Sequence, residues 1–229
     1  MALRAIVFDF DGVIANSEPL HFRGYRDVLA GEGVALTERD YYSQYLGFDD
    51  VGAFEAIGRT HGAAWSDDRI KDLVARKAER LEVLERDVSV LFPGAADAIR
   101  RASAVMPIAV ASGARGEEIR RVLSRERLID CFTAIVAAED TPVSKPAPDP
   151  YLRALALLEA ACGPGLRAAE CIAIEDSRWG LESARAAGLR TVAVTTTYKA
   201  EDLPADLRDL TIPSLQAMDL DLLARLCSE

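Results

Sequence analysis

The sequence predicts an α/β protein with a doubly wound, Rossmann-like parallel sheet at its core and a helical module inserted near its start. From residue 88 onward, short apolar runs alternate with stretches whose apolar positions have helical spacing, which is the pattern of repeated β-α-β units. The apolar runs are nearly continuous, as expected for strands that are covered on both faces. Residues 17–87, in contrast, show helical patterns and almost no strand signal.

Five short runs rich in Ala, Val and Ile are the expected strands of the core, namely 5–8, 108–111, 134–137, 172–174 and 191–194. Four amphipathic stretches are the expected core helices, namely 95–103, 117–123, 150–161 and 180–187. Because helices separate successive strands, the strands are expected to run parallel in one sheet.

The inserted module is expected to be a cap of four helices, near 19–30, 38–45, 50–61 and 67–85. Thr37 is the candidate N-cap of the second of these, because a threonine side chain can accept a hydrogen bond from a free amide of the first turn. The sequence therefore predicts a core of residues 1–16 and 88–229 and a cap of residues 17–87.

Composition and charge exclude several classes of function. The 229 residues have a formal net charge of −10, and such a field repels nucleic acid and anionic lipid, so neither is an expected partner. No apolar run approaches the roughly 18–20 residues that cross a bilayer, and no signal-peptide pattern precedes the first strand. The four cysteines show no CxxC or metal-ligand spacing, which fits a reducing cytoplasm. We also expect the protein to be a monomer.

Polar side chains follow three of the expected strands: Asp9 and Asp11, then Ser112, then Glu175 and Asp176. Ligands of open parallel sheets bind beyond the carboxyl ends of the strands, so these side chains are expected to converge. Close carboxylates repel by about 4 kcal/mol per pair at an effective dielectric near 20, and a divalent cation removes that repulsion. Oxygen donors without His or Cys favour Mg²⁺. An isolated Asp-x-Asp pair is common outside metal sites. The position of this pair directly after a buried strand is what favours a catalytic role.

Lys145 is the second candidate. It lies in the turn-rich segment Ser-Lys-Pro-Ala-Pro-Asp-Pro at 144–150, just before an expected helix. The chain has only four Lys against 23 Arg, so a lysine kept at this place indicates that a compact ammonium is needed. The alternative is a solvated lysine in a surface loop.

Together these residues resemble the haloacid dehalogenase superfamily. Its four motifs are matched in order by the segment Asp-Phe-Asp-Gly-Val at 9–13, by Ser112, by Lys145 and by the acidic pair at 175–176. The insert after the first motif, with Ser-Glu-Pro-Leu-His at 17–21, resembles the branch that contains β-phosphoglucomutase, phosphoglycolate phosphatase and several sugar-phosphate phosphatases.

The resemblance implies a role for each matching carboxylate. Asp9 would be the nucleophile and form a phosphoaspartate. Asp11 would protonate the leaving group and later take a proton from the hydrolytic water. Mg²⁺ would be bound by Asp9, the backbone carbonyl of Asp11 and Asp176, with Glu175 assisting.

The resemblance also implies a phosphate-binding set. Ser112, followed by Gly113, would hydrogen-bond a phosphoryl oxygen, and Lys145 would balance the charge of both Asp9 and the phosphoryl group. Arg115 is a further candidate for phosphate, with an exposed arginine at the start of a helix as the equal alternative.

Three cap residues are candidate substrate contacts, namely Glu18, His21 and Gly47. Glu18 and His21 are three residues apart and hence on one face of the first cap helix. A surface or core histidine is an equally good interpretation of His21.

The expected activity is that of a magnesium-dependent phosphatase of small phosphorylated metabolites, sugar phosphates in particular. In the resemblance, Asp11 favours hydrolysis of the phosphoenzyme. In the mutase, a lysine and an arginine flank the cap glycine, and this chain has Leu46 and Asp50 at those positions. Replacing two cations by an apolar and an acidic residue weakens the binding of a second phosphate. The alternatives are a phosphosugar mutase similar to β-phosphoglucomutase and a non-catalytic phosphate-sensing or partner-binding module. The intact motifs argue against the latter.

Overall fold

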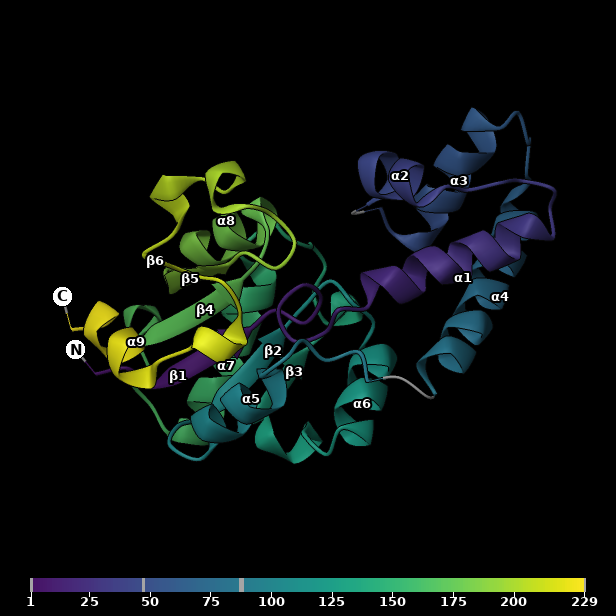
Figure 1. Ribbon diagram of the computed structural model, residues 1–229. Coiled ribbons are helices and arrows are strands. Elements are labelled where there is room, and N and C mark those ends of the chain that lie inside the picture. The colour runs from purple at the N-terminus through teal and green to yellow at the C-terminus, as the bar shows by residue number, and fades with distance from the viewer. Residues whose placement is uncertain (1, 47, 87–88, 229) are drawn as a thin grey trace. The chain divides into compact units, whose positions relative to one another are not determined.

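The computed structural model describes residues 2–46, 48–86 and 89–228, and the chain divides into two compact units (Figure 1). The core unit comprises Met1–Asn16 and Val90–Glu229, and the cap unit comprises Ser17–Ser89. The boundary expected from the sequence, between residues 87 and 88, falls on two positions outside the described residues.

The core contains a six-stranded sheet with the strand order β3-β2-β1-β4-β5-β6. The strands are β1 (Ala5–Phe8), β2 (Ile108–Ala111), β3 (Ala134–Val136), β4 (Cys171–Glu175), β5 (Arg190–Val194) and β6 (Leu210–Ile212). All neighbouring strands pair in parallel. The chain therefore progresses outward in both directions from β1, and the predicted doubly wound fold is confirmed. The switch in strand order lies between β1 and β4, which is where such folds bind ligands.

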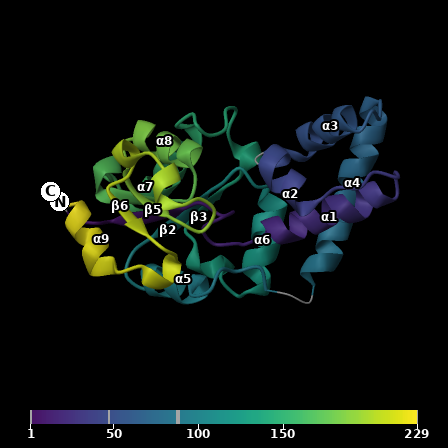
Figure 2. The same cartoon turned by 45° about the horizontal axis from the view of Figure 1, so that its top comes forward.

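Helices cover both faces of the sheet. They are α5 (Ala95–Ser103), α6 (Gly116–Arg125), α7 (Asp149–Cys162), α8 (Arg178–Ala186) and α9 (Leu220–Leu226). Figure 2 shows α7 and α8 on one face and α5 on the other. Every residue of β1, β2 and β4 is buried, as the unbroken apolar runs predict.

The register of the central strands sets the level of the residues that follow them. Phe8 of β1 lies opposite Val110 of β2 and Ile174 of β4. The amide of Asp9 extends this ladder by donating to the carbonyl of Ile174 at 3.0 Å. The residues that come next along these strands therefore meet at one edge of the sheet.

The cap consists of α1 (Glu18–Ala30), α2 (Glu38–Asp40), a π-helical turn (Tyr41–Tyr45), α3 (Asp50–Thr60) and α4 (Asp67–Glu85). These elements match the four expected helices, and the Thr37 hydroxyl accepts a hydrogen bond from the amide of Asp40 at 3.1 Å, as predicted for an N-cap. The cap has an apolar core of its own, which includes Tyr25, Phe54 and Leu73.

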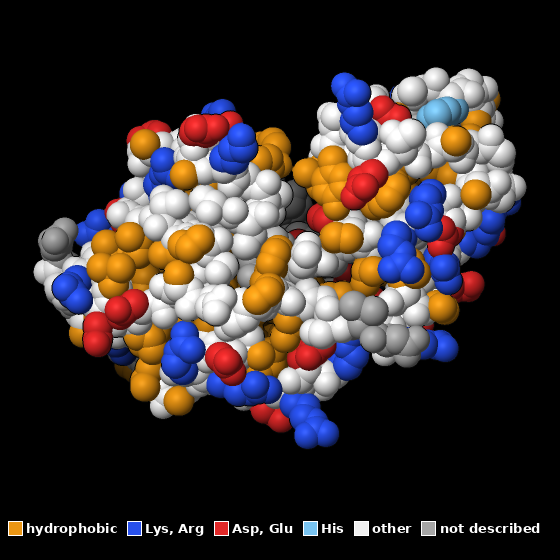
Figure 3. Space-filling model, in the orientation of Figure 1, with side chains coloured by type: hydrophobic (Ala, Val, Ile, Leu, Met, Phe, Trp, Pro, Cys, Tyr) orange, Lys and Arg blue, Asp and Glu red, His pale blue; other side chains and the backbone are white. Residues whose placement is uncertain are grey.

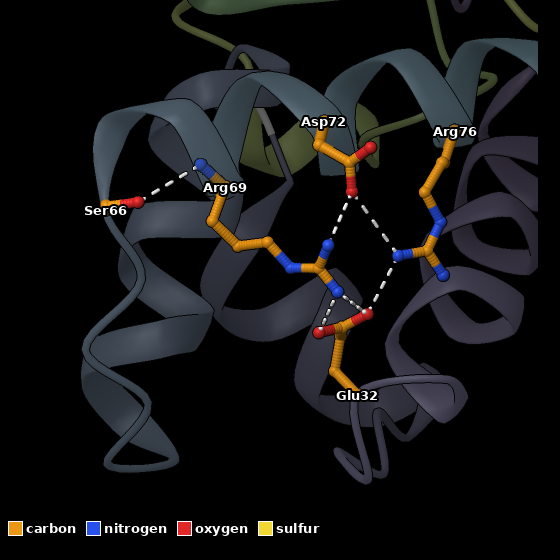
Figure 4. A network of polar contacts seen from close by, with 5 residues as sticks. All are labelled: Glu32, Ser66, Arg69, Asp72 and Arg76. Atoms are coloured by element: carbon orange, nitrogen blue, oxygen red, sulfur yellow. Dashed lines mark hydrogen bonds and ion pairs between the residues drawn. The ribbon is translucent and has the colours of Figure 1, made fainter.

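An ion-pair network ties the turn after α1 to α4 (Figure 4). Glu32 accepts from Arg69 at 2.6 Å and from Arg76 at 2.8 Å. Asp72 accepts from Arg69 at 2.7 Å and lies 3.6 Å from Arg76, so it connects the two arginines along the helix. The Ser66 hydroxyl caps the start of the same helix by accepting from the amide of Arg69 at 3.3 Å. The network fixes the turn after α1 against the N-terminal half of α4.

We expect Glu32→Gln to lower the free energy of unfolding by about 1 kcal/mol at neutral pH, as for a networked surface ion pair. Hydrogen bonds from Arg69 and Arg76 hold the pKa of Glu32 below its ordinary value of 4.5. A lowered pKa means that this stabilisation is present above pH 4.5 and is lost as the pH falls through the lowered pKa of Glu32 in the folded protein. The difference between the two proteins in urea unfolding should therefore shrink at pH 3.

The matched control is Glu55→Gln, which removes an exposed carboxylate 3.5 Å from Arg59 within a single helix. We expect little change in stability at either pH. An equal effect of both substitutions would show that the network around Glu32 contributes no more than an ordinary surface pair.

On the face of the core seen in Figure 3, acidic and basic side chains are interspersed, so the described residues of this face form no extended basic surface. Within the described part of the chain, no helix combines the length and the hydrophobicity needed to cross a bilayer. Among the described cysteines, Cys131 and Cys227 are free thiols.

Candidate active site

Three buried carboxylates converge at the carboxyl edge of the sheet. Asp9 follows β1, Glu175 ends β4 and Asp176 comes next in the chain. Each offers an oxygen that lies within 4.8 Å of the others, and their exposed fractions are 8%, 0% and 6%. The strand register described above produces this arrangement, because Phe8 and Ile174 are paired one residue before the acids.

Lys145 lies between two of these carboxylates. Its Nζ is 3.0 Å from Oδ1 of Asp9 and 2.6 Å from Oε1 of Glu175. Burial lowers the pKa of Lys145, but the charges of Asp9 and Glu175 outweigh burial and raise the pKa above its usual value. With a side chain only 12% exposed, Lys145 is not a solvated loop residue. It is a buried, protonated counter-charge.

One lysine is too little positive charge for three buried carboxylates. Burial, followed by the charge of Asp9, raises the pKa of both Glu175 and Asp176 above their ordinary values. Oε2 of Glu175 is buried and has no hydrogen-bond partner among the described residues. An all-oxygen donor set with surplus negative charge and an uncompensated buried oxygen fits a hard divalent cation.

Two glycines make room for the acidic cluster. A Cβ on Gly12, which has φ +74°, would overlap the carboxylate of Asp176 and approach Oγ1 of Thr197 at 2.7 Å. A Cβ on Gly180, in the first turn of α8, would overlap the carboxylate of Glu175. The loop after β1 and the start of α8 therefore pack directly on the acids.

The loop after β1, which contains Asp11, folds back on itself. The amide of Gly12 donates to the carbonyl of Ala15 at 2.9 Å, and the amide of Phe10 donates to Oδ1 of Asp9 at 2.7 Å. Asp11 is half-buried. Its side chain is not one of the three clustered carboxylates, and the resemblance assigns its backbone carbonyl, not its side chain, to the metal.

The phosphate-binding candidates follow β2. Ser112 is 3% exposed, and its hydroxyl accepts a hydrogen bond from the amide of Ala114 at 3.1 Å. Gly113 and Arg115 are exposed, and Arg115 directly precedes α6. Ser112 thus lies at the same sheet edge as the acids, while the structure shows Arg115 as an exposed arginine at the start of a helix.

Glu139 supports this loop and was missed by the sequence analysis. Its carboxylate accepts from the amide of Gly116 at 3.0 Å and so caps the start of α6. The segment that contains Ser112 is thereby fixed between β2 and a capped helix. A glutamate distant in sequence gives no pattern from which this contact could be predicted.

Two of the three cap candidates, Glu18 and His21, have polar partners within the cap. Oε2 of Glu18 accepts from the hydroxyl of Tyr41 at 2.7 Å, and Nδ1 of His21 lies 2.8 Å from Nζ of Lys77. Nζ of Lys77 is also 2.7 Å from Oδ1 of Asp50. Gly47, the third cap candidate, lies outside the described residues.

Lys77 was missed because the sequence comparison considered only positions 46 and 50 for cap cations. A signal did exist: Lys77 interrupts the apolar stripe of α4, whose other buried members include Ile70, Leu73 and Leu81. A lysine in such a stripe must have a partner, because an unpaired buried ammonium is costly.

Comparison with known proteins agrees with the fold. The sequence matches the haloacid dehalogenase-like hydrolase family over residues 6–194. It is 34% identical to protein CbbY of Rhodobacter capsulatus over 228 residues, which cover 95% of this chain and 96% of that protein. It is 30% identical to hexitol phosphatase B of Escherichia coli (strain K12) over 221 residues, covering 94% and 96% respectively.

A solved structure of CbbY from Rhodobacter sphaeroides in complex with xylulose-(1,5)bisphosphate has a TM-score of 0.78 and 26% identity to this chain, and the match covers 95% of this chain and 96% of that one. The family match and the phosphatase-named relative identify an enzyme of the hydrolase class. The chain belongs to the haloacid dehalogenase-like hydrolase family.

Proposed function

We propose that this protein is a magnesium-dependent phosphatase that hydrolyses small phosphorylated metabolites, sugar phosphates in particular, through a phosphoaspartate on Asp9. The observation that supports this most strongly is the position of Asp9. Its carboxylate lies at the end of the central strand, 3.0 Å from the ammonium of Lys145 and within 4.8 Å of oxygens from two further acids.

Asp9, Asp176 and the backbone carbonyl of Asp11 would hold the Mg²⁺, with Glu175 assisting. When bound, Mg²⁺ screens the repulsion between the carboxylate of Asp9 and an anionic phosphate. The all-oxygen donor set and the uncompensated Oε2 of Glu175 support this assignment.

The residues of the chain divide the chemistry between them. An oxygen of Asp9 attacks phosphorus in line and forms an acyl phosphate, while the bond from phosphorus to the substrate oxygen breaks. Asp11 gives its proton to that leaving oxygen. Asp11 then takes a proton from water, which attacks the acyl phosphate, releases inorganic phosphate and regenerates Asp9. Lys145 and the hydroxyl of Ser112 bind the phosphoryl oxygens throughout.

Sugar or polyol monophosphates are the proposed substrates. One relative is named as a hexitol phosphatase, and another was solved with a sugar bisphosphate. In the cap of this chain, the buried Lys77 is paired with Asp50 at 2.7 Å. Because Asp50 balances most of the charge of Lys77, little positive charge is left to bind a second phosphate. We assign substrate recognition in the cap to Glu18 and His21.

The test is a panel of sugar, polyol and small-acid monophosphates with one sugar bisphosphate, each assayed for phosphate release with Mg²⁺ or with EDTA. We expect release from monophosphates that depends on the metal. An isomerised sugar phosphate with little free phosphate would instead indicate a mutase, and binding without release would indicate a sensor. We propose no nucleic-acid or membrane partner for a chain of net charge −10, and we place the enzyme in the cytoplasm as a monomer.

Gly12→Ala is expected to reduce metal-dependent phosphate release by about a hundredfold, because displacing a catalytic group by about 1 Å has an effect of that size. The new Cβ must push the carboxylate of Asp176 aside, since the two would overlap. Steady-state assays across Mg²⁺ concentrations measure the effect.

Gly33→Ala is the matched control, because Gly33 has the same φ of +74° but a Cβ there meets no heavy atom within 4 Å among the described residues. Both variants share the cost of a left-handed backbone, roughly 1–2 kcal/mol. Equal activity losses in the two variants would show that backbone strain alone, and not contact with Asp176, requires glycine at position 12.

A further inference from the structure

Tyr151 is a buried polar residue that the proposed mechanism does not use. It lies in the first turn of α7 and is 0% exposed. Its ring belongs to the apolar cluster beneath the sheet, together with small side chains such as Ala109 and Ala111. Its hydroxyl donates to Oε1 of Glu175 at 2.5 Å. The side chain therefore reaches the acidic cluster from inside the protein.

The two oxygens of Glu175 have unequal surroundings. Oε1 accepts from both Tyr151 and Lys145, at 2.5 and 2.6 Å. Oε2 is buried and has no hydrogen-bond partner among the described residues. The carboxylate is also packed on Gly180, where a Cβ would overlap it. One oxygen thus accepts from two donors, and the other is buried with no donor among the described residues.

Tyr151 and Lys145 differ in how firmly they can hold the carboxylate of Glu175 with Oε1 toward them. The terminal torsion of a glutamate is broad and roughly two-fold, so nothing intrinsic distinguishes its two oxygens. A lysine ammonium on a flexible stem can follow either oxygen. The hydroxyl of a tyrosine cannot follow either oxygen in this way when its ring is fixed in a packed cluster.

We infer that Tyr151 is a positioning residue for the metal site: it fixes the carboxylate of Glu175 with Oε1 turned to Lys145, so that Oε2 is the oxygen offered to the divalent cation. The inference rests on the metal site of the proposed function. Partners that orient a metal-binding carboxylate typically change metal affinity by 10–100-fold when they are removed.

The test is the affinity for Mn²⁺ alone, measured by calorimetry without substrate. We expect Tyr151→Phe, which keeps the ring and loses the hydroxyl, to weaken Mn²⁺ binding about tenfold. Tyr151→Leu, which also fills an apolar site, should give the same direction of change if the first variant folds poorly. In a Glu175→Gln background, Tyr151→Phe should change the affinity less than about twofold, because its effect passes through Glu175.

Tyr25→Phe is the matched control. Tyr25 is also a buried tyrosine, 2% exposed, and its hydroxyl donates to a carboxylate, Oδ1 of Asp50, at 2.6 Å. Because this pair lies within the cap unit, we expect unchanged Mn²⁺ affinity. Unchanged affinity in Tyr151→Phe, an equal loss in Tyr25→Phe, or additive losses with Glu175→Gln would each overturn the inference.

These outcomes are distinct from failure of the proposed function. A wild-type protein that binds Mn²⁺ with the expected dependence on Tyr151, yet releases phosphate from no monophosphate, would refute the proposed reaction and leave the role of Tyr151 supported. A wild-type protein that binds no divalent cation would overturn both.

Discussion

Asp9→Asn is expected to lower kcat for phosphate release at least about a thousandfold, which corresponds to about 4 kcal/mol of activation free energy. An amide oxygen is a far weaker nucleophile than a carboxylate and cannot form the acyl phosphate. The substitution keeps an oxygen that can accept from the amide of Phe10 and from Lys145, which contact Oδ1 of Asp9 at 2.7 and 3.0 Å. The loss should therefore be chemical and not structural.

Thermal unfolding in EDTA separates these two explanations. Removing one charge from a buried group of three carboxylates relieves repulsion, so the variant should unfold at a temperature no lower than wild type. The control is Asp68→Asn, the same chemical change at a side chain that is 94% exposed, and it should leave both activity and stability unchanged. Substantial turnover by Asp9→Asn would exclude Asp9 as the nucleophile.

Lys145→Ala is expected to lower kcat by roughly 100–1000-fold, the usual effect of removing one donor that stabilises developing charge. It should also destabilise the protein by about 3–5 kcal/mol, because it leaves the buried carboxylates of Asp9 and Glu175 without their cation. Lys145→Arg should restore little activity, since the planar guanidinium is larger than the ammonium that fits between the two acids.

Phosphate-release assays and urea unfolding measure both effects. Lys199→Ala is the control, because that lysine is 80% exposed and its nearest acidic partner, Glu201, is 3.8 Å away. Full activity in Lys145→Arg would contradict the requirement for a compact ammonium at this position.

The sheet and its acidic edge are predictable from the sequence because both depend on local pattern. Unbroken apolar runs mark the buried strands, and the residues that follow such runs must lie at the carboxyl edge of a parallel sheet. β6 was missed because it has only three residues and just one of them, Ile212, is buried. The start of α8 was placed at Gly180 and not at Arg178, although the Ser177 hydroxyl caps that helix.

The partners within the site could not be predicted in the same way. Lys145, Tyr151 and Glu175 come from separate elements, and no spacing rule indicates that two donors share one carboxylate oxygen. Tyr151 resembles any other apolar residue of α7 in the sequence, because its hydroxyl is visible as functional only once Glu175 is placed beside it. The sequence indicates which side chains lie at the edge of the sheet, but not which of them form hydrogen bonds or ion pairs with one another.

The cap illustrates a different difficulty. Its helices follow from periodicity, but the pairing of Lys77 with Asp50, at 2.7 Å, joins residues 27 positions apart and follows from no local pattern. The acidic residue that argued against a second phosphate is thus also the partner of a buried lysine. The cap does contain a buried cation, and its pairing with Asp50 is what favours monophosphates over bisphosphates.

The most direct test of the account is to trap the covalent intermediate. Wild-type protein is mixed with Mg²⁺ and a monophosphate that it hydrolyses, and the reaction is quenched in acid within the first turnover. The protein is then digested, and its peptides are sequenced by mass spectrometry. We expect a phosphoryl group on Asp9, absent from Asp9→Asn and lost on treatment with hydroxylamine, which cleaves acyl phosphates. Phosphate release during that turnover with an unmodified Asp9, or with the phosphoryl group on another residue, would contradict the proposed mechanism.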